Sequence, residues 1–469
     1  MSPRSCAALV ALMSCTLAGL TPLHARTSGP TLPATMQLLR EAISTQTVEG
    51  KGQVPALARR LADQLESAGF AKADIEIIPV GETAALVVRY RGKGKGEPIL
   101  ISGHMDVVAA NPADWQRDPF TLIEEDGYLY GRGVADMKTN LVTLVATFMR
   151  LKREGFVPRQ DLILLFSGDE ETQMASTREL ARRFHQARFL LNADAGGGTL
   201  DADGKPIGYE IQAAEKSYAD FTLTVTSAGG HSSEPDPARN AIYHLARALE
   251  AIAAYQFPVQ HSDITLASLK ALGSRGQGPL AQAMRDFAAT PDNAQAAATI
   301  TADPAYVGQI RTTCIATTLE GGHALNALPQ HAQANINCRI FPGTGVAAVK
   351  HTLEQVIGDS SVTITVRPPP PVESPSSPLR ADVLAAVTTA IRARFPGLDV
   401  VPGMSAGATD SMYFRVAGVP SFGVSPNFAK PNDTFAHGLN ERLPTAEVPA
   451  ALDYWYRLLK LLDRPSAPR

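Results

Sequence analysis

The stretch Pro98-Ile99-Leu100-Ile101-Ser102-Gly103-His104-Met105-Asp106 places two chemically active side chains directly after a short apolar run. A continuous apolar run without alternation is typical of a strand that is buried on both faces. Further runs of this kind lie at 162–166, 189–191 and 421–424, and residues 141–148 carry an apolar stripe at helical spacing. Buried strands that alternate with helices predict an α/β fold, with a mostly parallel sheet covered by helices on both faces.

The pattern changes between residues 217 and 367. In chain order, strands or helices are expected at 219–226 (strand), 237–255 (helix), 312–320 (strand), 332–340 (strand), 345–357 (helix) and 362–366 (strand). This order is that of a ferredoxin-like β-α-β-β-α-β unit. We therefore expect an inserted α+β domain at 217–367, which would act as a lid or dimerisation domain.

Two further segments complete the expected organisation. Residues 258–309 are rich in Ala and Gln and predict a helical insertion within the small domain. The prolines from 368 to 371 predict a stiff, extended connection back to the first domain. The catalytic domain would then comprise residues 26–216 and 368–469, the latter including this connection.

Length and charge agree with this division. A chain of 469 residues, 45% of them hydrophobic, exceeds one hydrophobic core and can fill two. The net charge is −3 and no dense Lys/Arg cluster occurs, so a phosphate backbone finds no basic surface. We expect no nucleic acid among the partners.

The first 25 residues have the features of a secretory signal peptide. Arg4 precedes an apolar stretch from residue 6 to 20, and Ala25 offers a small residue before the cut. We expect export across the inner membrane, with the periplasm as the destination, and no membrane-spanning segment after cleavage. The alternatives are a membrane anchor, for which the apolar run is short, and lipid attachment at Cys15.

Several acidic and histidine side chains follow the ends of the expected strands. In an open α/β sheet, ligands bind in the crevice beyond the carboxyl ends of the strands. Mixed imidazoles and carboxylates suit zinc, with manganese or cobalt as substitutes, better than calcium or magnesium. Taken singly, the plainer alternatives are a turn cap for Asp194 and a surface histidine for His437. Taken jointly, so many acids at one edge need a cation. The candidates are His104, Asp106, Asp136, Glu170, Glu171, Asp194 and His437.

At these residues the chain resembles the M20 family of zinc metallopeptidases, the carboxypeptidase, aminoacylase and dipeptidase group. The resemblance covers nearly all of the chain after the signal peptide. It rests on the strings Ser102-Gly103-His104-Met105-Asp106-Val107-Val108, Gly131-Arg132-Gly133-Val134-Ala135-Asp136-Met137-Lys138, Ser167-Gly168-Asp169-Glu170-Glu171, Gly229-Gly230-His231-Ser232-Ser233, Asn326-Ala327-Leu328-Pro329 and Ala406-Gly407-Ala408-Thr409-Asp410-Ser411.

The resemblance implies a pair of zinc ions. Asp136 would bridge both ions, His104 and Asp194 would complete one site, and Glu171 and His437 would complete the other. It also implies a cis peptide bond after the bridging aspartate.

Two acids next to the ligands take catalytic roles by the same resemblance. Asp106 would orient the ring of His104, and Glu170 would act as the general base. Met137 stands where many relatives carry Asp or Asn, which leaves the bridge itself intact.

The small domain would supply further site residues. His231 resembles the family's oxyanion donor, and Asn326 and Arg339 resemble its substrate-binding pair. Gly407 and Thr409 lie in the loop that resembles its carboxylate-binding backbone. The plainer alternatives are a turn histidine for His231 and a solvated strand-edge charge for Arg339.

These features predict a di-zinc hydrolase of amide bonds. Small peptides are the first expected substrates, through carboxypeptidase or dipeptidase action, and N-acyl amino acids are the second. A binding protein on a peptidase scaffold is disfavoured because the ligand set is complete. Dimeric relatives pair the edges of their small domains, so a homodimer is expected unless the 258–309 insertion covers that edge.

Two cysteines, Cys314 and Cys338, remain after removal of the signal peptide. They lie on consecutive expected strands, each twelve residues from Asn326 in the connecting turn. An antiparallel register without a bulge places them opposite each other on one face. We expect either a cross-strand disulfide or two small buried side chains.

Overall fold

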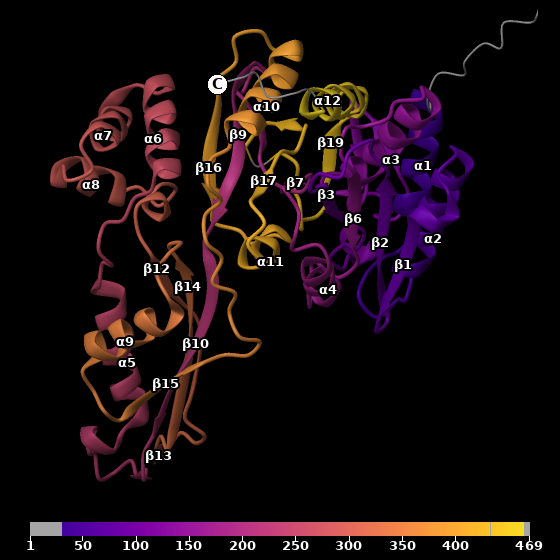
Figure 1. Ribbon diagram of the computed structural model, residues 1–469. Coiled ribbons are helices and arrows are strands. Elements are labelled where there is room, and N and C mark those ends of the chain that lie inside the picture. The colour runs from indigo at the N-terminus through magenta and orange to yellow at the C-terminus, as the bar shows by residue number, and fades with distance from the viewer. Residues whose placement is uncertain (1–30, 432, 464–469) are drawn as a thin grey trace, which may run out of the picture.

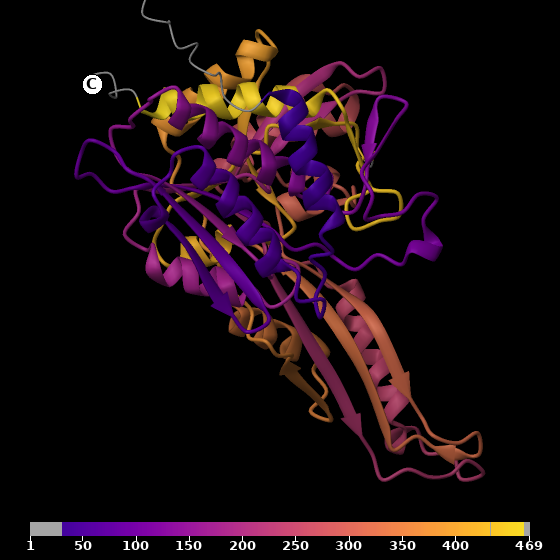
Figure 2. The ribbon, with the colours of Figure 1, turned by 90° about the vertical axis from the view of Figure 1, so that its right-hand side faces the viewer.

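The computed structural model describes residues 31–431 and 433–463. The expected signal peptide and the alternative at Cys15 lie outside these residues. Figure 1 shows a large body of sheet and helices from which a long, narrow sheet projects, and the turned view in Figure 2 shows the same projection. Within the described part of the chain, no helix is both long and apolar enough to cross a membrane.

The large body is built on a ten-stranded sheet whose central strands are parallel, as the sequence predicts. Antiparallel pairs lie toward its two sides. Across the sheet the order is β1 (Ile75–Val80), β2 (Thr83–Tyr90), β6 (Leu162–Ser167), β3 (Ile99–His104), β7 (Phe189–Asn192), β17 (Ser421–Gly423), β9 (Pro206–Glu215), β8 (Gly197–Leu200) and β18 (Phe428–Ala429), with β16 (Val400–Ser405) also paired to β9.

Helices bury both faces of this sheet because its strands are apolar on both sides. In β3, Ile99 and Ile101 join one hydrophobic cluster, whereas Leu100 joins the cluster on the opposite face. The first face is covered by α1 (Leu32–Ser44), α2 (Val54–Ser67), α3 (Lys138–Arg153), α10 (Ala381–Arg394) and α12 (Glu447–Leu462), and the second by α4 (Ala175–Arg183) and α11 (Ser411–Val416). A small separate sheet contains β4 (Ile123–Glu125), β5 (Tyr128–Tyr130) and β19 (Arg442–Pro444).

The projecting sheet lies within residues 217–367, which we call the lid. Its strand order is β12-β14-β10-β15, the arrangement of a ferredoxin-like unit, and two helices cover one face. The predicted helix at 237–255 starts at Ala241 instead, because Asn240 caps it and Pro237–Arg239 forms a separate 3-10 turn. The elements are β10 (Ser217–Thr226), α5 (Ala241–Ala254), β12 (Thr313–Gly321), β14 (His331–Ile340), α9 (Val346–Ile357) and β15 (Val362–Val366).

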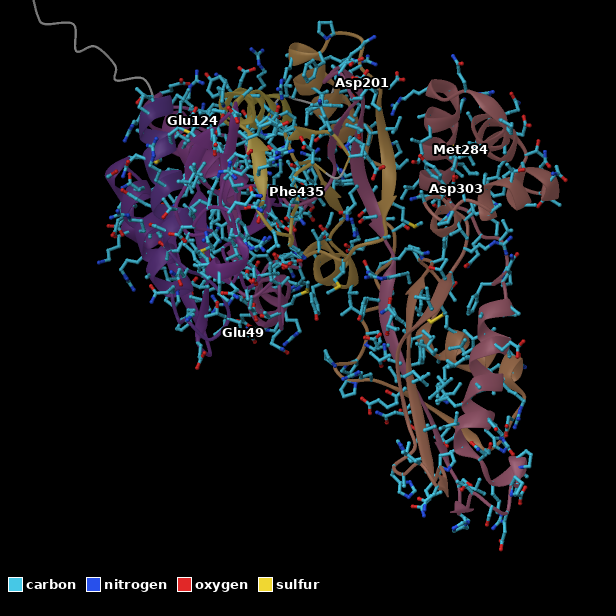
Figure 3. All side chains as sticks on the ribbon, turned by 180° about the vertical axis from the view of Figure 1, so that it is seen from behind. Glu49, Glu124, Asp201, Met284, Asp303 and Phe435 are labelled. Carbon is cyan, nitrogen blue, oxygen red and sulfur yellow. A yellow bond between two sulfur atoms is a disulfide. The ribbon has the colours of Figure 1, made fainter. Side chains whose placement is uncertain are left out.

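The helical insertion forms three helices, α6 (Asp263–Arg275), α7 (Gly278–Ala289) and α8 (Ala294–Thr301). It packs on the large body rather than on the lid edge: α6 lies against β16 and β9, and Ile264 joins the main core. Figure 1 shows the three helices beyond the end of the lid sheet, and Met284 and Asp303 mark the insertion in Figure 3. The idea that it covers the lid edge is therefore wrong, since Ile315 to Gly321 of β12 are exposed.

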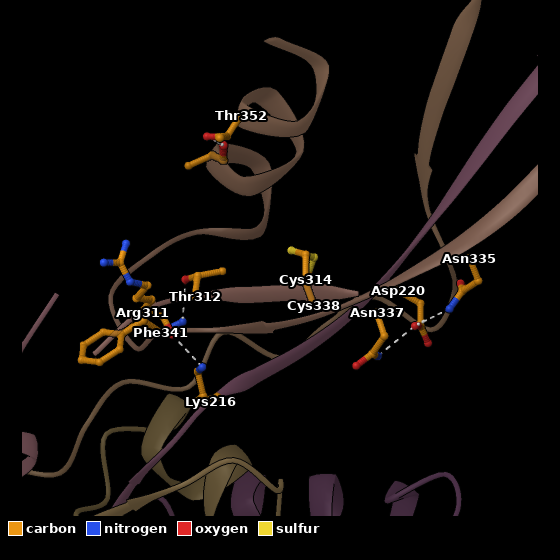
Figure 4. Close-up of a disulfide and its surroundings, with 11 residues drawn as sticks. Lys216, Asp220, Arg311, Thr312, Cys314, Asn335, Asn337, Cys338, Phe341 and Thr352 are labelled. Atoms are coloured by element: carbon orange, nitrogen blue, oxygen red, sulfur yellow. Dashed lines mark hydrogen bonds between the residues drawn. A yellow bond between two sulfur atoms is a disulfide. The ribbon is translucent and has the colours of Figure 1, made fainter. Parts of the chain in front are cut away.

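The two cysteines form a disulfide, Cys314–Cys338 (Figure 4). Their Cα atoms are direct partners in the β12–β14 register, as the sequence predicts. A bulge between Ala316 and Thr318 shifts the register only on the side nearer the turn. The disulfide, of the two alternatives for these cysteines, is thus confirmed.

Candidate metal centre

Strand ends bring the expected ligands to one place. His104 is the last residue of β3, Glu171 follows β6, and Asp194 follows β7. Asp136 lies in the loop between β5 and α3, and His437 lies in the loop before β19, where Figure 3 labels the nearby Phe435. Three neighbouring parallel strands and two loops therefore converge beyond the carboxyl edge of the sheet.

Asp136 occupies the middle of this group. Its Oδ1 atom lies 3.0 Å from His104 Nε2, and its Oδ2 atom lies 3.1 Å from His437 Nε2. His104 Nε2 is also 3.4 Å from Asp194 Oδ1, and His437 Nε2 is 3.0 Å from Glu171 Oε2. Each carboxylate oxygen of Asp136 thus faces one histidine, and each of these histidines also contacts one further acid. Ligands of a tetrahedral zinc ion at about 2.1 Å lie roughly 3.4 Å apart, so these spacings fit two adjacent metal sites.

The charges of the group also call for a cation. Burial raises the pKa of Asp194 to about 7 and, with the nearby acids, raises the pKa of Glu170 well above its usual value. Burial lowers the pKa of His104, but Asp194 and hydrogen bonds to its acidic neighbours bring it well above the ordinary value. Hydrogen bonds to Asp136 and Glu171 raise the pKa of His437 to about 10. Acids buried and crowded in this way are stabilised as carboxylates by a nearby cation.

Glu441, which the sequence did not single out, shapes the loop that carries Asp136. Its fully buried carboxylate accepts hydrogen bonds from the backbone N–H groups of Gly133, Ala135 and Asp136. It also forms an ion pair with Arg132 at 2.6 Å. The peptide bond after Asp136 is cis, as the resemblance implied. The only sequence sign of this role is the position of Glu441 four residues after His437.

The Gly133 position in the same loop admits no side chain. Its φ is +85°, and a Cβ atom would lie 2.6 Å from Val107. The loop can therefore pack against the segment that follows His104 only with glycine here.

Asp106 positions Glu170 and Glu171 more directly than it positions the ring of His104. Its Oδ1 and Oδ2 atoms accept the backbone N–H groups of Glu170 at 3.1 Å and Glu171 at 3.0 Å. His104 Nδ1 lies 3.0 Å from the backbone carbonyl oxygen of Asp106 and 3.5 Å from its carboxylate. The ring is thus oriented mainly by that carbonyl group, and the carboxylate sets the position of the Glu170–Glu171 pair.

Glu170 is buried beside the candidate ligands. It does not share the close pairing of Glu171, whose carboxylate lies 3.0 Å from His437 Nε2. One of its carboxylate oxygens lies within 4.8 Å of ligand atoms of both His104 and Asp194. A buried carboxyl of raised pKa beside the metal sites suits a group that accepts and releases a proton.

Arg339 and the Gly407 loop meet at the base of the lid. The Arg339 guanidinium donates to the backbone carbonyl of Ala406 at 2.8 Å and lies 4.6 Å above the ring of Tyr218. Thr409 is buried and its hydroxyl donates to Glu215 at 3.1 Å, whereas Gly407 is exposed. The structure therefore presents Gly407 and its neighbouring backbone, rather than the Thr409 side chain, to solvent.

His231 and Asn326 are not brought to the metal ligands. Both are exposed. His231 ends β11 (Gly230–His231), which pairs with β13 (Ala327–Leu328), and Asn326 directly precedes β13. The N–H of Ser232 donates to the Asn326 carbonyl at 3.1 Å. Figure 1 shows β13 at the end of the lid farthest from the large body. The described chain thus assembles the metal ligands but leaves these two residues apart from them.

The chain is similar to proteins of one known family. The family model described as Peptidase family M20/M25/M40 matches residues 100–461. The human N-fatty-acyl-amino acid synthase/hydrolase PM20D1 is 27% identical over 387 residues, covering 79% of this chain and 75% of that protein. A probable succinyl-diaminopimelate desuccinylase from Staphylococcus aureus is 30% identical over 294 residues, covering 62% and 66%.

Solved structures share the fold. The M20 metallo-carboxypeptidase Sso-CP2 from Sulfolobus solfataricus aligns with a TM-score of 0.69 at 18% identity, covering 92% of this chain and 99% of that one. The Bacillus subtilis YXEP protein, described as a dinuclear metal-binding peptidase of the M20 family, aligns with a TM-score of 0.58 at 14% identity, covering 91% and 97%. Together with the family match and the ligand geometry, these likenesses show that the chain belongs to peptidase family M20/M25/M40 and is a hydrolase of amide bonds.

Proposed function

We propose that the protein is a two-metal hydrolase that releases an amino acid with a free α-carboxylate from an N-acyl amino acid or a short peptide. The observation that carries this proposal is Asp136, which directs one carboxylate oxygen toward His104 and the other toward His437. A single metal ion would need only one of these oxygens, directed toward one histidine.

The proposed metals are two zinc ions, with cobalt or manganese as substitutes. Two imidazoles among carboxylates form a donor set that zinc accepts readily. His104, Asp194 and Asp136 would hold one ion, and Glu171, His437 and Asp136 the other. When bound, the pair would lower the pKa of a shared water and polarise the scissile carbonyl.

Glu170 is the proposed general base. Its carboxyl is held beside the ligands because the backbone N–H of this residue donates to Asp106. Its proposed role is to take a proton from the attacking water and deliver it to the nitrogen of the leaving amine. Burial keeps water from competing for that proton.

The proposed anchor for the α-carboxylate is Arg339 with the backbone around Gly407. A guanidinium can bind both oxygens of a carboxylate, and backbone N–H groups of this loop other than that of Gly407, which donates to Ser405 at 3.0 Å, can add further hydrogen bonds. Arg339 already contacts this loop through Ala406, so the two parts of the anchor adjoin each other.

N-acyl amino acids become the first candidate substrates because the PM20D1 relatives are named for them. Peptides, which the sequence pattern favours first, are the second candidate. Support for them comes from the probable carboxypeptidase S-like 2 of Dictyostelium discoideum, 26% identical over 397 residues. Both classes share a leaving amino acid with a free carboxylate.

A homodimer that pairs the β12 edges of two lids is part of the proposal. The exposed fractions of Ile315 and Leu319 on this edge strand are 67% and 66%. An exposed apolar edge favours pairing with another strand. Such a dimer could bring His231 of one subunit to the metals of the other, where it would bind the oxyanion. The Cys314–Cys338 disulfide suits the proposed periplasmic location, an oxidising compartment.

The test is a substrate screen with metal-stripped and reloaded protein. Zinc-loaded protein should hydrolyse N-acyl amino acids or short peptides, chelation should abolish turnover, and zinc, cobalt or manganese should restore it. Elemental analysis should find about two metal ions per chain. Full activity of a metal-free preparation, or a preference for substrates without a free carboxylate, would overturn the proposal.

A further inference from the structure

A cavity of about 250 Å³ lies between the base of the lid and the large body. Tyr218 lines it from the lid, Met174 and Met412 line it from the large body, and the prolines at 368–371 form the wall between them. Its lining also includes Thr172, the residue that follows the candidate ligand Glu171 in the chain.

We infer that this cavity receives the side chain of the leaving amino acid and selects apolar and aromatic side chains. The inference rests on the proposed function, since it assumes a substrate that ends in a free α-carboxylate. It adds the identity of the preferred amino acid to that proposal.

The first argument is position. The side chain and the carboxylate of an amino acid are attached to the same carbon, so their binding sites must adjoin. The cavity touches Ala408, within the loop proposed to bind the carboxylate, and its wall residue Tyr218 lies 4.6 Å beneath the Arg339 guanidinium. The acyl group lies on the other side of the scissile bond, so its binding site need not adjoin the carboxylate site.

The second argument is the chemistry of the lid face. Successive residues of β10 alternate between the two faces of the sheet, so Tyr218 and Asp220 share the face opposite α5 and α9. The Asp220 carboxylate accepts hydrogen bonds from Tyr218, Asn335 and Asn337 at 2.6, 2.8 and 3.0 Å, the last two of which are drawn in Figure 4. These hydrogen bonds hold the acid in place, and the nearby Arg367 guanidinium offsets its negative charge.

The third argument is the charge at the cavity rim. Arg178 and Arg367 both line the cavity and are exposed. Arg178 donates to the Gln173 carbonyl at 2.7 Å and to the Tyr413 hydroxyl at 3.3 Å, which keeps its charge at the opening. Two guanidinium groups disfavour a lysine or arginine side chain, whereas the methionine, tyrosine and proline walls favour an apolar one.

The fourth argument is size. Pockets for drug-sized ligands span about 300–1,000 Å³, so 250 Å³ holds one side chain but not a long acyl chain as well. The cavity therefore fits the amino-acid part of an N-acyl amino acid better than the acyl part.

The test uses two substrate series with the zinc-loaded full chain. In the first, one acyl group is joined to Phe, Leu, Met, Ala or Lys; in the second, Phe carries acyl groups of increasing length. We expect kcat/KM for Phe and Leu to exceed that for Ala by about 10- to 100-fold, with Lys lowest. Isothermal titration of the protein with L-phenylalanine and L-alanine gives a readout without turnover and should show the same order.

Met412→Trp fills the cavity and should remove the advantage of Phe and Leu while leaving the order of acyl groups unchanged. Met412→Ala enlarges it and should favour the largest side chains. Val416→Trp is the matched control, because Val416 is 55% exposed on the same helix and does not line the cavity.

Three outcomes separate the possibilities. If Met412→Trp changes the acyl series instead, the cavity binds the acyl group and the inference is wrong. An equal loss on all amino acids, with native thermal stability, would also refute it. If the wild-type protein hydrolyses no substrate of either series, the proposed function itself fails.

Discussion

The metal centre and the tip of the lid differ in how their residues are assembled. The proposed metal ligands lie at the ends of β3, β6 and β7 and in two loops that close over them, so one sheet brings them together. His231 and Asn326 lie at the far end of a projecting sheet, where nothing in the described chain brings them to the metals. The first region is complete within one chain, whereas the second requires lid movement or a partner subunit.

The largest expected effect is on kcat and comes from removing the proposed base beside the metal centre. Glu170→Gln should lower kcat by about 10²- to 10⁴-fold, because the variant cannot accept the proton of the attacking water. Its metal content should stay at the wild-type level by elemental analysis. The matched control is Glu171→Gln, one residue away, which should lose metal. Near-normal turnover of Glu170→Gln would remove it as the base.

The next effect concerns the lid tip. His231→Ala should lower kcat by about 10²- to 10³-fold if the histidine stabilises the oxyanion. When its subunits are mixed equally with Glu170→Gln subunits, random pairing leaves one intact site in half of the dimers. About a quarter of wild-type activity should then return.

The mixing experiment needs proof of subunit exchange, which mass spectrometry of differently tagged subunits provides. Exchange without recovery of activity would show that His231 does not act across the dimer. A strictly monomeric protein would refute the dimer as well and leave lid movement as the way in which the tip reaches the metals.

A smaller effect is expected at Arg339, which stands between the two regions. Arg339→Ala should raise KM for substrates with a free α-carboxylate by about 10- to 100-fold, because a charge-assisted hydrogen-bond pair is lost. Amidated analogues, assayed in parallel, should change little. Arg339→Lys is the control that keeps the charge without the planar fork. Equal changes for both substrate types would leave Arg339 as a structural contact to Ala406.

The smallest effect on activity is expected from the disulfide. Cys338→Ala should lower the stability of the lid by about 2–4 kcal/mol, since the bridge closes a loop in the unfolded chain. Metal content should not change, because the bridge lies in the lid and the ligands do not. Thermal unfolding and elemental analysis of the variant measure the two quantities. Loss of metal from the folded variant would mean that the disulfide also supports the metal centre.

Much of this arrangement could be predicted from local patterns. Runs such as 99–102 are apolar on both faces, which defines a buried strand, and the residue after such a strand necessarily lies at the edge of the sheet. The opposed positions of the two cysteines follow from their equal distances to a turn, which leaves both a disulfide and two small buried side chains open. Each of these inferences uses residues close together in the chain.

Other features depend on distant contacts and could not be predicted. Glu441 accepts hydrogen bonds from a loop about three hundred residues earlier, and no local pattern marks such a partner. The insertion is helical as predicted, but the surface on which α6 packs depends on β16, which had not been identified as a strand. The start of α5 was misplaced because Asn240 caps it after a short 3-10 turn.

The place of the insertion has a mechanical consequence. An inserted domain is normally attached by its two connecting strands alone and can rotate about them. Here the insertion adds a third attachment, through Ile264 of α6 in the main core and the side-chain amide of Gln309, which donates to the Met404 carbonyl at 3.2 Å. The buried Lys216, at the entry to the lid, also donates to the Arg311 carbonyl at 2.7 Å. Three points of attachment oppose free rotation, so the lid and the large body should melt in a single calorimetric transition.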